Sequence, residues 1–80
     1  MTKMEYVEYL MSKYEGYKER AQQYEFVKLF YADMIIKPYY KDLKENYVEE
    51  HADIFIKHMS ELLRTMGIDI LSIEVTENNA

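Results

Sequence analysis

Carboxylates are the most numerous side chains in this sequence that could do chemistry, and many of them recur at helical spacing. Fifteen Asp and Glu residues stand against ten Lys and Arg residues, which gives a net charge of −5. Two sets follow three- and four-residue steps, with Ser12 filling the gap between Glu8 and Glu15 in the first, so each set would line one face of a helix. These sets are Glu5, Glu8, Glu15 and Glu19, and Asp42, Glu45, Glu49 and Asp53.

Two functions fit these acidic faces. Carboxylates about 6 Å apart are spaced like the phosphates of a nucleic-acid strand, so the faces could mimic a nucleic acid and fill the basic cleft of another protein. Interleaved lysines such as Lys44 and Lys57 also fit an ordinary solvated helix surface. The net negative charge disfavours direct binding to nucleic acid or to anionic lipid, because both are themselves negatively charged.

Tyrosines form the second unusual set, with nine in 80 residues. Tyr14, Tyr17, Tyr24 and Tyr31 would share one face of a continuous helix, because their spacing is three or seven residues. A tyrosine ring buries apolar area while its hydroxyl stays near water, which suits a surface that contacts another protein. The sequence therefore predicts that this tyrosine face is either core and self-association surface or a binding site for a different protein.

Enzyme chemistry and metal binding have little support in the sequence. No serine has an evident base and orienting acid, and there is no glycine-rich phosphate loop. His51 and His58 would lie two helical turns apart, about 10 Å, which is too far for one chain to hold one metal ion. We expect no catalytic residues, no cofactor and no metal, although a symmetric dimer that brings histidines together keeps a metal- or ligand-binding bundle open as a further alternative.

The elements that position these residues are predicted from caps, breakers and periodicity. Thr2 and Glu5 fit a capping box, so a helix is expected from about residue 3, and its apolar stripe continues to about 36. Pro38 predicts a turn, because proline removes an N–H and restricts the residue before it. A second helix is expected over about 39–66, and Gly67 supplies its stop.

The C-terminal residues are rich in β-branched side chains. Residues 68–76 therefore predict a short strand or an extended arm, and the polar residues 77–80 a frayed tail. The predicted fold is a single, mainly all-α domain over 1–80, built as a long antiparallel helical hairpin.

A hairpin would leave part of the second helix uncovered, because that helix is apolar over more than one face. We therefore expect a homodimer that forms a four-helix bundle. The residues predicted for the core or the dimer interface are Val48, Phe55, Met59, Leu62 and Met66.

Composition limits where the protein works and what it does. There is no cysteine, no signal-like apolar run and no apolar run long enough to cross a bilayer, which favours a cytoplasmic protein without a membrane partner. Small size, acidity and many tyrosines without a catalytic motif are common among small regulatory and inhibitory proteins, including those of phages. The predicted function is a non-enzymatic protein that binds and modulates, or inhibits, another protein; the alternative is the acidic nucleic-acid mimic.

Overall fold

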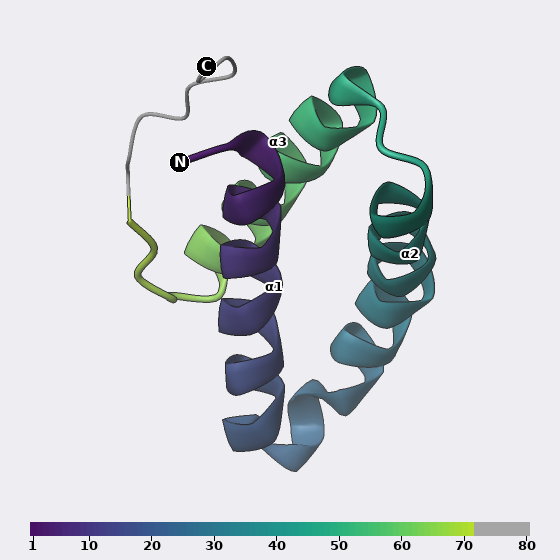
Figure 1. Ribbon diagram of the computed structural model, residues 1–80. Helices are drawn as coiled ribbons and strands as arrows, with labels where there is room; N and C mark the ends of the chain where they lie inside the picture. Colours follow the sequence, from purple (N-terminus) through teal and green to yellow (C-terminus); the bar gives the residue numbers. More distant parts are fainter. Residues whose placement is uncertain (72–80) are drawn as a thin grey trace.

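The computed structural model describes residues 1–71, and these residues form three α-helices and one short 3₁₀ turn (Figure 1). In chain order they are α1 (Lys3–Arg20), η1 (Gln23–Glu25), α2 (Phe26–Glu45) and α3 (Glu49–Thr65). The prediction of a mainly helical protein is confirmed. The predicted division into two long helices is wrong, and the two places where it fails determine which residues face solvent.

α1 begins where the sequence predicted. The Thr2 hydroxyl accepts a hydrogen bond from the Glu5 N–H at 3.1 Å, and the Glu5 carboxylate accepts one from the Thr2 N–H at 2.8 Å. Two backbone donors at the helix start are thereby satisfied. The bond from the Thr2 backbone also lowers the pKa of Glu5, because it favours the charged carboxylate.

The predicted continuous helix over 3–36 is interrupted after Arg20. Ala21 and Gln22 are extended, with ψ angles of 147° and 156°, and the chain reverses into η1 and then α2. The Gln22 N–H donates to the Glu25 carboxylate at 2.9 Å, which stabilises this reversal. Folding back brings the apolar side of α2 against the other helices, whereas a straight helix would carry it into solvent.

Pro38 does not form the predicted turn, because it lies inside α2 and the helix continues to Glu45. A proline in a helix removes one donor, and here the carbonyl that loses its donor is that of Met34, four residues earlier. Pro38 is exposed, so no buried packing opposes its ring. The chain instead turns at residues 46–48, and the predicted helix over 39–66 is divided between α2 and α3.

The end of α3 agrees with its prediction more closely. α3 ends at Thr65 with Met66 as its C-cap, and Gly67 has a φ of +79°. That left-handed conformation is open to glycine at little cost, which explains why the helix stops there.

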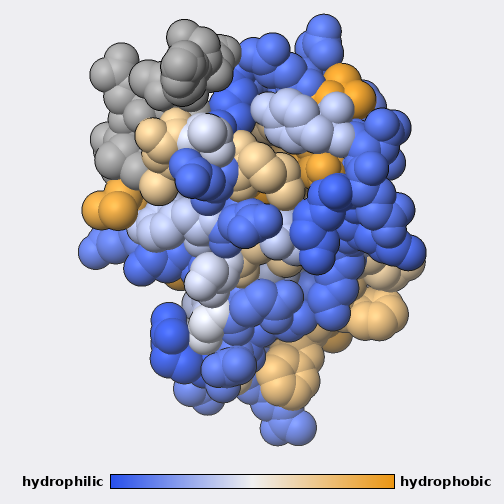
Figure 2. Space-filling model, viewed as in Figure 1, coloured by the Kyte–Doolittle hydropathy of each residue, from blue (hydrophilic) through white to orange (hydrophobic). Residues whose placement is uncertain are grey.

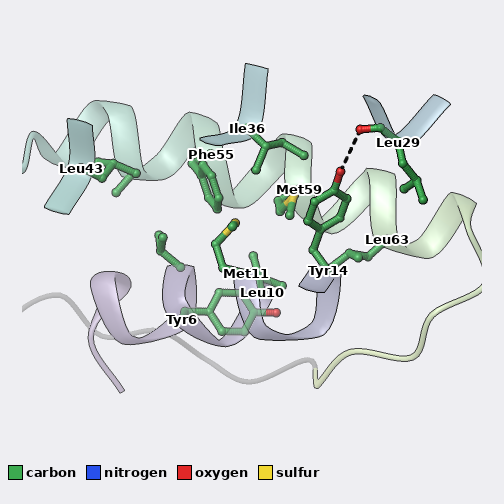
Figure 3. Packing of buried hydrophobic residues seen from close by; sticks show 12 residues of the cluster. Tyr6, Leu10, Met11, Tyr14, Leu29, Ile36, Leu43, Phe55, Met59 and Leu63 are labelled. Carbon is green, nitrogen blue, oxygen red and sulfur yellow. Dashed lines mark hydrogen bonds between the residues drawn. The ribbon is translucent and has the colours of Figure 1, made fainter. Parts of the chain in front are cut away.

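The chain runs along α1, reverses at η1 and returns along α2, and α3 then passes behind α1 (Figure 1). The hairpin predicted from the sequence therefore survives only as α1 and α2, with a third helix added. α1 packs most closely against α3. Figure 3 shows Leu10, Met11 and Tyr14 of α1 pointing toward Phe55 and Met59 of α3.

Buried apolar side chains from all three helices form one core. They are Tyr6, Val7, Leu10, Met11, Tyr14, Leu29, Ile36, Leu43, Ala52, Phe55, Met59 and Leu63. Of the residues predicted for a core or dimer interface, Phe55 and Met59 are buried, Leu62 and Met66 pack partly buried against the core, and Val48 is half-buried.

The segment after α3 lies against α1. The Tyr6 hydroxyl donates to the Leu71 carbonyl at 2.7 Å, and the Leu71 N–H donates to the Tyr9 hydroxyl at 2.9 Å. Residues 68–71 form no strand. The rest of the predicted arm, 72–76, and the predicted tail, 77–80, lie outside the described residues.

Replacing Phe55 with alanine should destabilise the fold by about 3–5 kcal/mol, because Phe55 is only 4% exposed and packs between α1 and α2. Its neighbour Ile54 is 43% exposed, so Ile54→Ala is a matched control that should cost much less. Urea unfolding followed by circular dichroism measures both. Equal losses of stability in the two variants would contradict the packing of α3 described here.

Replacing Gly16 with alanine should stabilise the protein by roughly 0.5–1 kcal/mol. Gly16 lies inside α1, where glycine costs backbone entropy. An added Cβ would meet only the end of the Arg20 side chain, at an ordinary contact distance of 3.6 Å. A higher thermal midpoint is the expected result, and a lower one would mean that the position is more crowded than the structure indicates.

Candidate interaction surface

A polar contact on the inner side of α2 fixes how this helix sits on α1. The Asp33 carboxylate accepts hydrogen bonds from the Tyr14 hydroxyl at 2.7 Å and from the Lys18 ammonium at 2.8 Å. Lys37 lies 3.6 Å from the same carboxylate. The Tyr14 hydroxyl is also 3.3 Å from the Leu29 carbonyl, a bond drawn in Figure 3. We call Tyr14, Lys18, Asp33 and Lys37 the Asp33 cluster.

Charge and burial in this cluster act in opposite directions on Asp33. Burial by itself would raise the pKa of Asp33, but the hydrogen bonds from Lys18 and Tyr14 and the two lysine charges outweigh it, so the pKa is lowered. Burial, with the carboxylate beside it, raises the pKa of Tyr14. Asp33 is therefore held as an anion and Tyr14 as a neutral donor, which is the combination that ties α2 to α1.

With its inner side fixed in this way, α2 turns an apolar surface outward. Seven large apolar side chains from η1 and the first half of α2 are between 53% and 83% exposed. We call them the apolar face: Tyr24, Phe26, Val27, Phe30, Tyr31, Met34 and Ile35. Figure 2 shows tan hydrophobic atoms along the lower right edge of the molecule, where this part of α2 lies in Figure 1.

A groove borders the apolar face where α2 meets α3. Its volume is about 290 Å³, and apart from His58 and the hydroxyl of Tyr39 its lining is apolar. The lining residues are Ala32, Ile35, Ile36, Tyr39, Ile54, Phe55, His58, Met59 and Leu62. Ile35 belongs both to the groove and to the apolar face, so the two features form one continuous surface.

The tyrosines that were predicted to share a face are separated. Tyr14 is fully buried in the core, and Tyr17 is half-buried, with its hydroxyl donating to the Glu25 carboxylate. Tyr24 and Tyr31 are exposed members of the apolar face. Their spacing would place all four on one side only if one continuous helix ran through residues 21–25, and the chain reverses there instead.

Five residues of the apolar face were missed from the sequence: Phe26, Val27, Phe30, Met34 and Ile35. Their signal was available, because residues 26–36 include only two charged side chains, Lys28 and Asp33, and are apolar in nearly every direction around a helix. A helix that is apolar all round is either buried on every side or leaves an apolar side exposed, as α2 does.

The predicted acidic faces are exposed but do not form two continuous surfaces. Glu5, Glu8, Glu15 and Glu19 remain together on α1, whereas Asp42 and Glu45 lie on α2 and Glu49 and Asp53 on α3. The last two pair with Lys3, whose Nζ lies 2.9 Å from Glu49 and 2.7 Å from Asp53. These pairs raise the pKa of Lys3 and join the starts of α1 and α3.

The two histidines are in different environments. His51 Nδ1 lies 3.9 Å from an Asp42 carboxylate oxygen, and the His51 ring meets Tyr39 edge-on. His58 lines the groove. Within residues 1–71, no three His, Asp or Glu side chains gather in a way that could hold a metal ion. The helices of this region also lack a segment long and apolar enough to cross a membrane.

The described part of the chain is thus a three-helix domain with one apolar surface on α2 and the edge of α3. Comparisons with models of protein families, with curated proteins and with solved structures found no match.

Replacing Asp33 with asparagine should destabilise the fold by roughly 1–3 kcal/mol near neutral pH, because the Lys18 and Lys37 charges lose their counter-ion. Since the folded-state pKa of Asp33 is lowered, its contribution is present above the usual carboxyl pKa of 3.8 and is lost as pH falls through the folded value. The stability difference between wild type and variant should therefore shrink below about pH 4. Urea titrations across this range measure it, with the exposed Asp69→Asn as control; a difference independent of pH would contradict the argument.

Proposed function

We propose that this chain is a non-enzymatic interaction protein that binds and modulates another protein through the apolar face of α2. The observation that carries the proposal is the exposure of seven large apolar side chains on η1 and the first half of α2. Soluble monomers seldom expose contiguous apolar patches of this extent, and such patches commonly mark protein contacts. A cytoplasmic location is proposed with it, on composition alone.

The chemistry of the apolar face supports this function. Four of its seven residues are aromatic, and aromatic side chains supply much of the binding energy at protein interfaces. The tyrosine hydroxyls can stay at a wet rim while their rings are covered. The adjoining groove would accept a side chain or a helix from the partner, as in complexes where an amphipathic helix lies in an apolar groove.

The rigidity of α2 also supports this function. Tyr14 and Lys18 of α1 hold the inner side of the helix through their hydrogen bonds to Asp33, so the apolar face is presented without a loop having to be ordered first. Preorganisation of this kind reduces the entropy that association costs.

Mimicry of a nucleic acid is the competing proposal, and the arrangement of the carboxylates supports it less. The second predicted acidic set is divided by the turn at 46–48, and two of its members neutralise Lys3. Salt separates the two functions, because contacts between exposed charges are screened whereas burial of apolar rings is not.

The test is affinity capture by the full-length tagged chain from extract of its own host, with mass spectrometry of the bound proteins. Ile35→Glu places a charge at the junction of face and groove and should abolish capture of the partner. Leu71→Glu is the matched control, because Leu71 is 56% exposed, lies outside the face, and the substitution changes the net charge equally.

Capture that depends on Ile35 and survives salt of about 0.5 M, where the Debye length is only a few ångströms, would support the proposal. A partner retained by both variants but released by that salt would support mimicry instead. A partner retained by both variants at high salt would contradict both functions.

A further inference from the structure

We propose that in the free protein the apolar face is covered by the same face of a second copy, paired about a two-fold axis. This inference rests on the proposed function only in that it uses the same surface. It states that a second copy of the chain covers this surface before a different protein binds. It differs from the hairpin dimer expected from the sequence, because the pairing helix is α2 and its neighbour is α3.

The exposed area matches what such a pair requires. The seven side chains present on the order of 800 Å² of apolar surface, given that an aromatic side chain alone carries about 150–250 Å². A stable interface of standard size buries about 800 Å² on each partner. The face of one copy can therefore supply a complete half-interface without any other element.

The surface is also complementary to itself. Val27, Tyr31 and Ile35 are spaced by four residues and form a ridge along α2, and the groove between α2 and α3 runs beside that ridge. Ridges of this spacing pack into grooves between the side chains of a neighbouring helix. Because a two-fold axis makes every contact occur twice, the ridge of each copy can enter the groove of the other.

Charge favours this face over the rest of the molecule. None of the seven residues is charged. The two carboxylates among them in the sequence, Glu25 and Asp33, are partly buried and accept hydrogen bonds from α1, whereas Lys28 and Lys37 are exposed. The exposed carboxylates of α1, by contrast, would meet like charges in a symmetric pair, and the chain as a whole carries a net charge of −5. Pairing through α2 keeps most of these carboxylates apart.

The resulting interface contains four helices, α2 and α3 of each copy, while each α1 keeps its place in the core of its own copy. His58 lies in the groove and would become part of the interface, whereas Lys3, Glu49 and Asp53 at the far end of α3 would remain at the surface.

The experiment is sedimentation equilibrium of the full chain across concentrations on the order of one to several hundred micromolar. We expect the wild type to reach the mass of a dimer. In Ile35→Glu the dissociation constant of the dimer should rise roughly 30-fold or more, so that this variant stays monomeric at tens of micromolar. Leu71→Glu should dimerise like the wild type. Val27→Glu, on the same ridge, is a second variant, and far-ultraviolet circular dichroism confirms that each variant is folded.

A wild type that remains monomeric at the highest concentration would overturn the pairing. So would a dimer that persists in both Ile35→Glu and Val27→Glu. These results are separate from those of the capture experiment: a monomer that still captures a partner through Ile35 leaves the proposed function standing, whereas an α2-dependent dimer that captures nothing supports the pairing and overturns the binding of a different protein.

Discussion

The fold depends on the hydrogen bonds that the Asp33 carboxylate accepts from Tyr14 and Lys18. α2 contacts the rest of the protein less extensively than α1 and α3 contact each other, so apolar packing alone does little to fix its rotation. A partly buried carboxylate needs donors at defined positions, and here Tyr14 and Lys18 of α1 supply them. The rotation of α2 that satisfies Asp33 also buries Leu29 and Ile36 and turns the apolar face outward.

The parts of the fold that follow from local rules could be predicted from the sequence. The start of α1 follows from the Thr2–Glu5 capping box, and the end of α3 from Gly67, because each depends on a few neighbouring residues. The burial of Phe55 and Met59 follows from strong helical periodicity in α3.

The two turns could not be predicted, because they depend on long-range packing. Ala21 and Gln22 include no glycine or proline, and the chain reverses there only because α2 has a core to return to. Pro38 is a strong breaker locally, but at an exposed position one missing hydrogen bond is outweighed by burial of Tyr40 and Leu43 beyond it. The predicted tyrosine face was wrong for the same reason as the first turn, because it required a continuous helix through residues 21–25.

Pro38 has a consequence for recognition. Pro38 has no N–H to donate to the Met34 carbonyl, four residues earlier, and Met34 and Pro38 are both exposed on α2. A carbonyl that keeps no donor when a partner excludes water costs about 1–3 kcal/mol, unless the partner supplies a donor. A tyrosine hydroxyl or an amide on the opposing surface meets that requirement. If the apolar face is covered as proposed, Pro38 would make the choice of partner depend on a hydrogen-bond donor near Met34 as well as on shape.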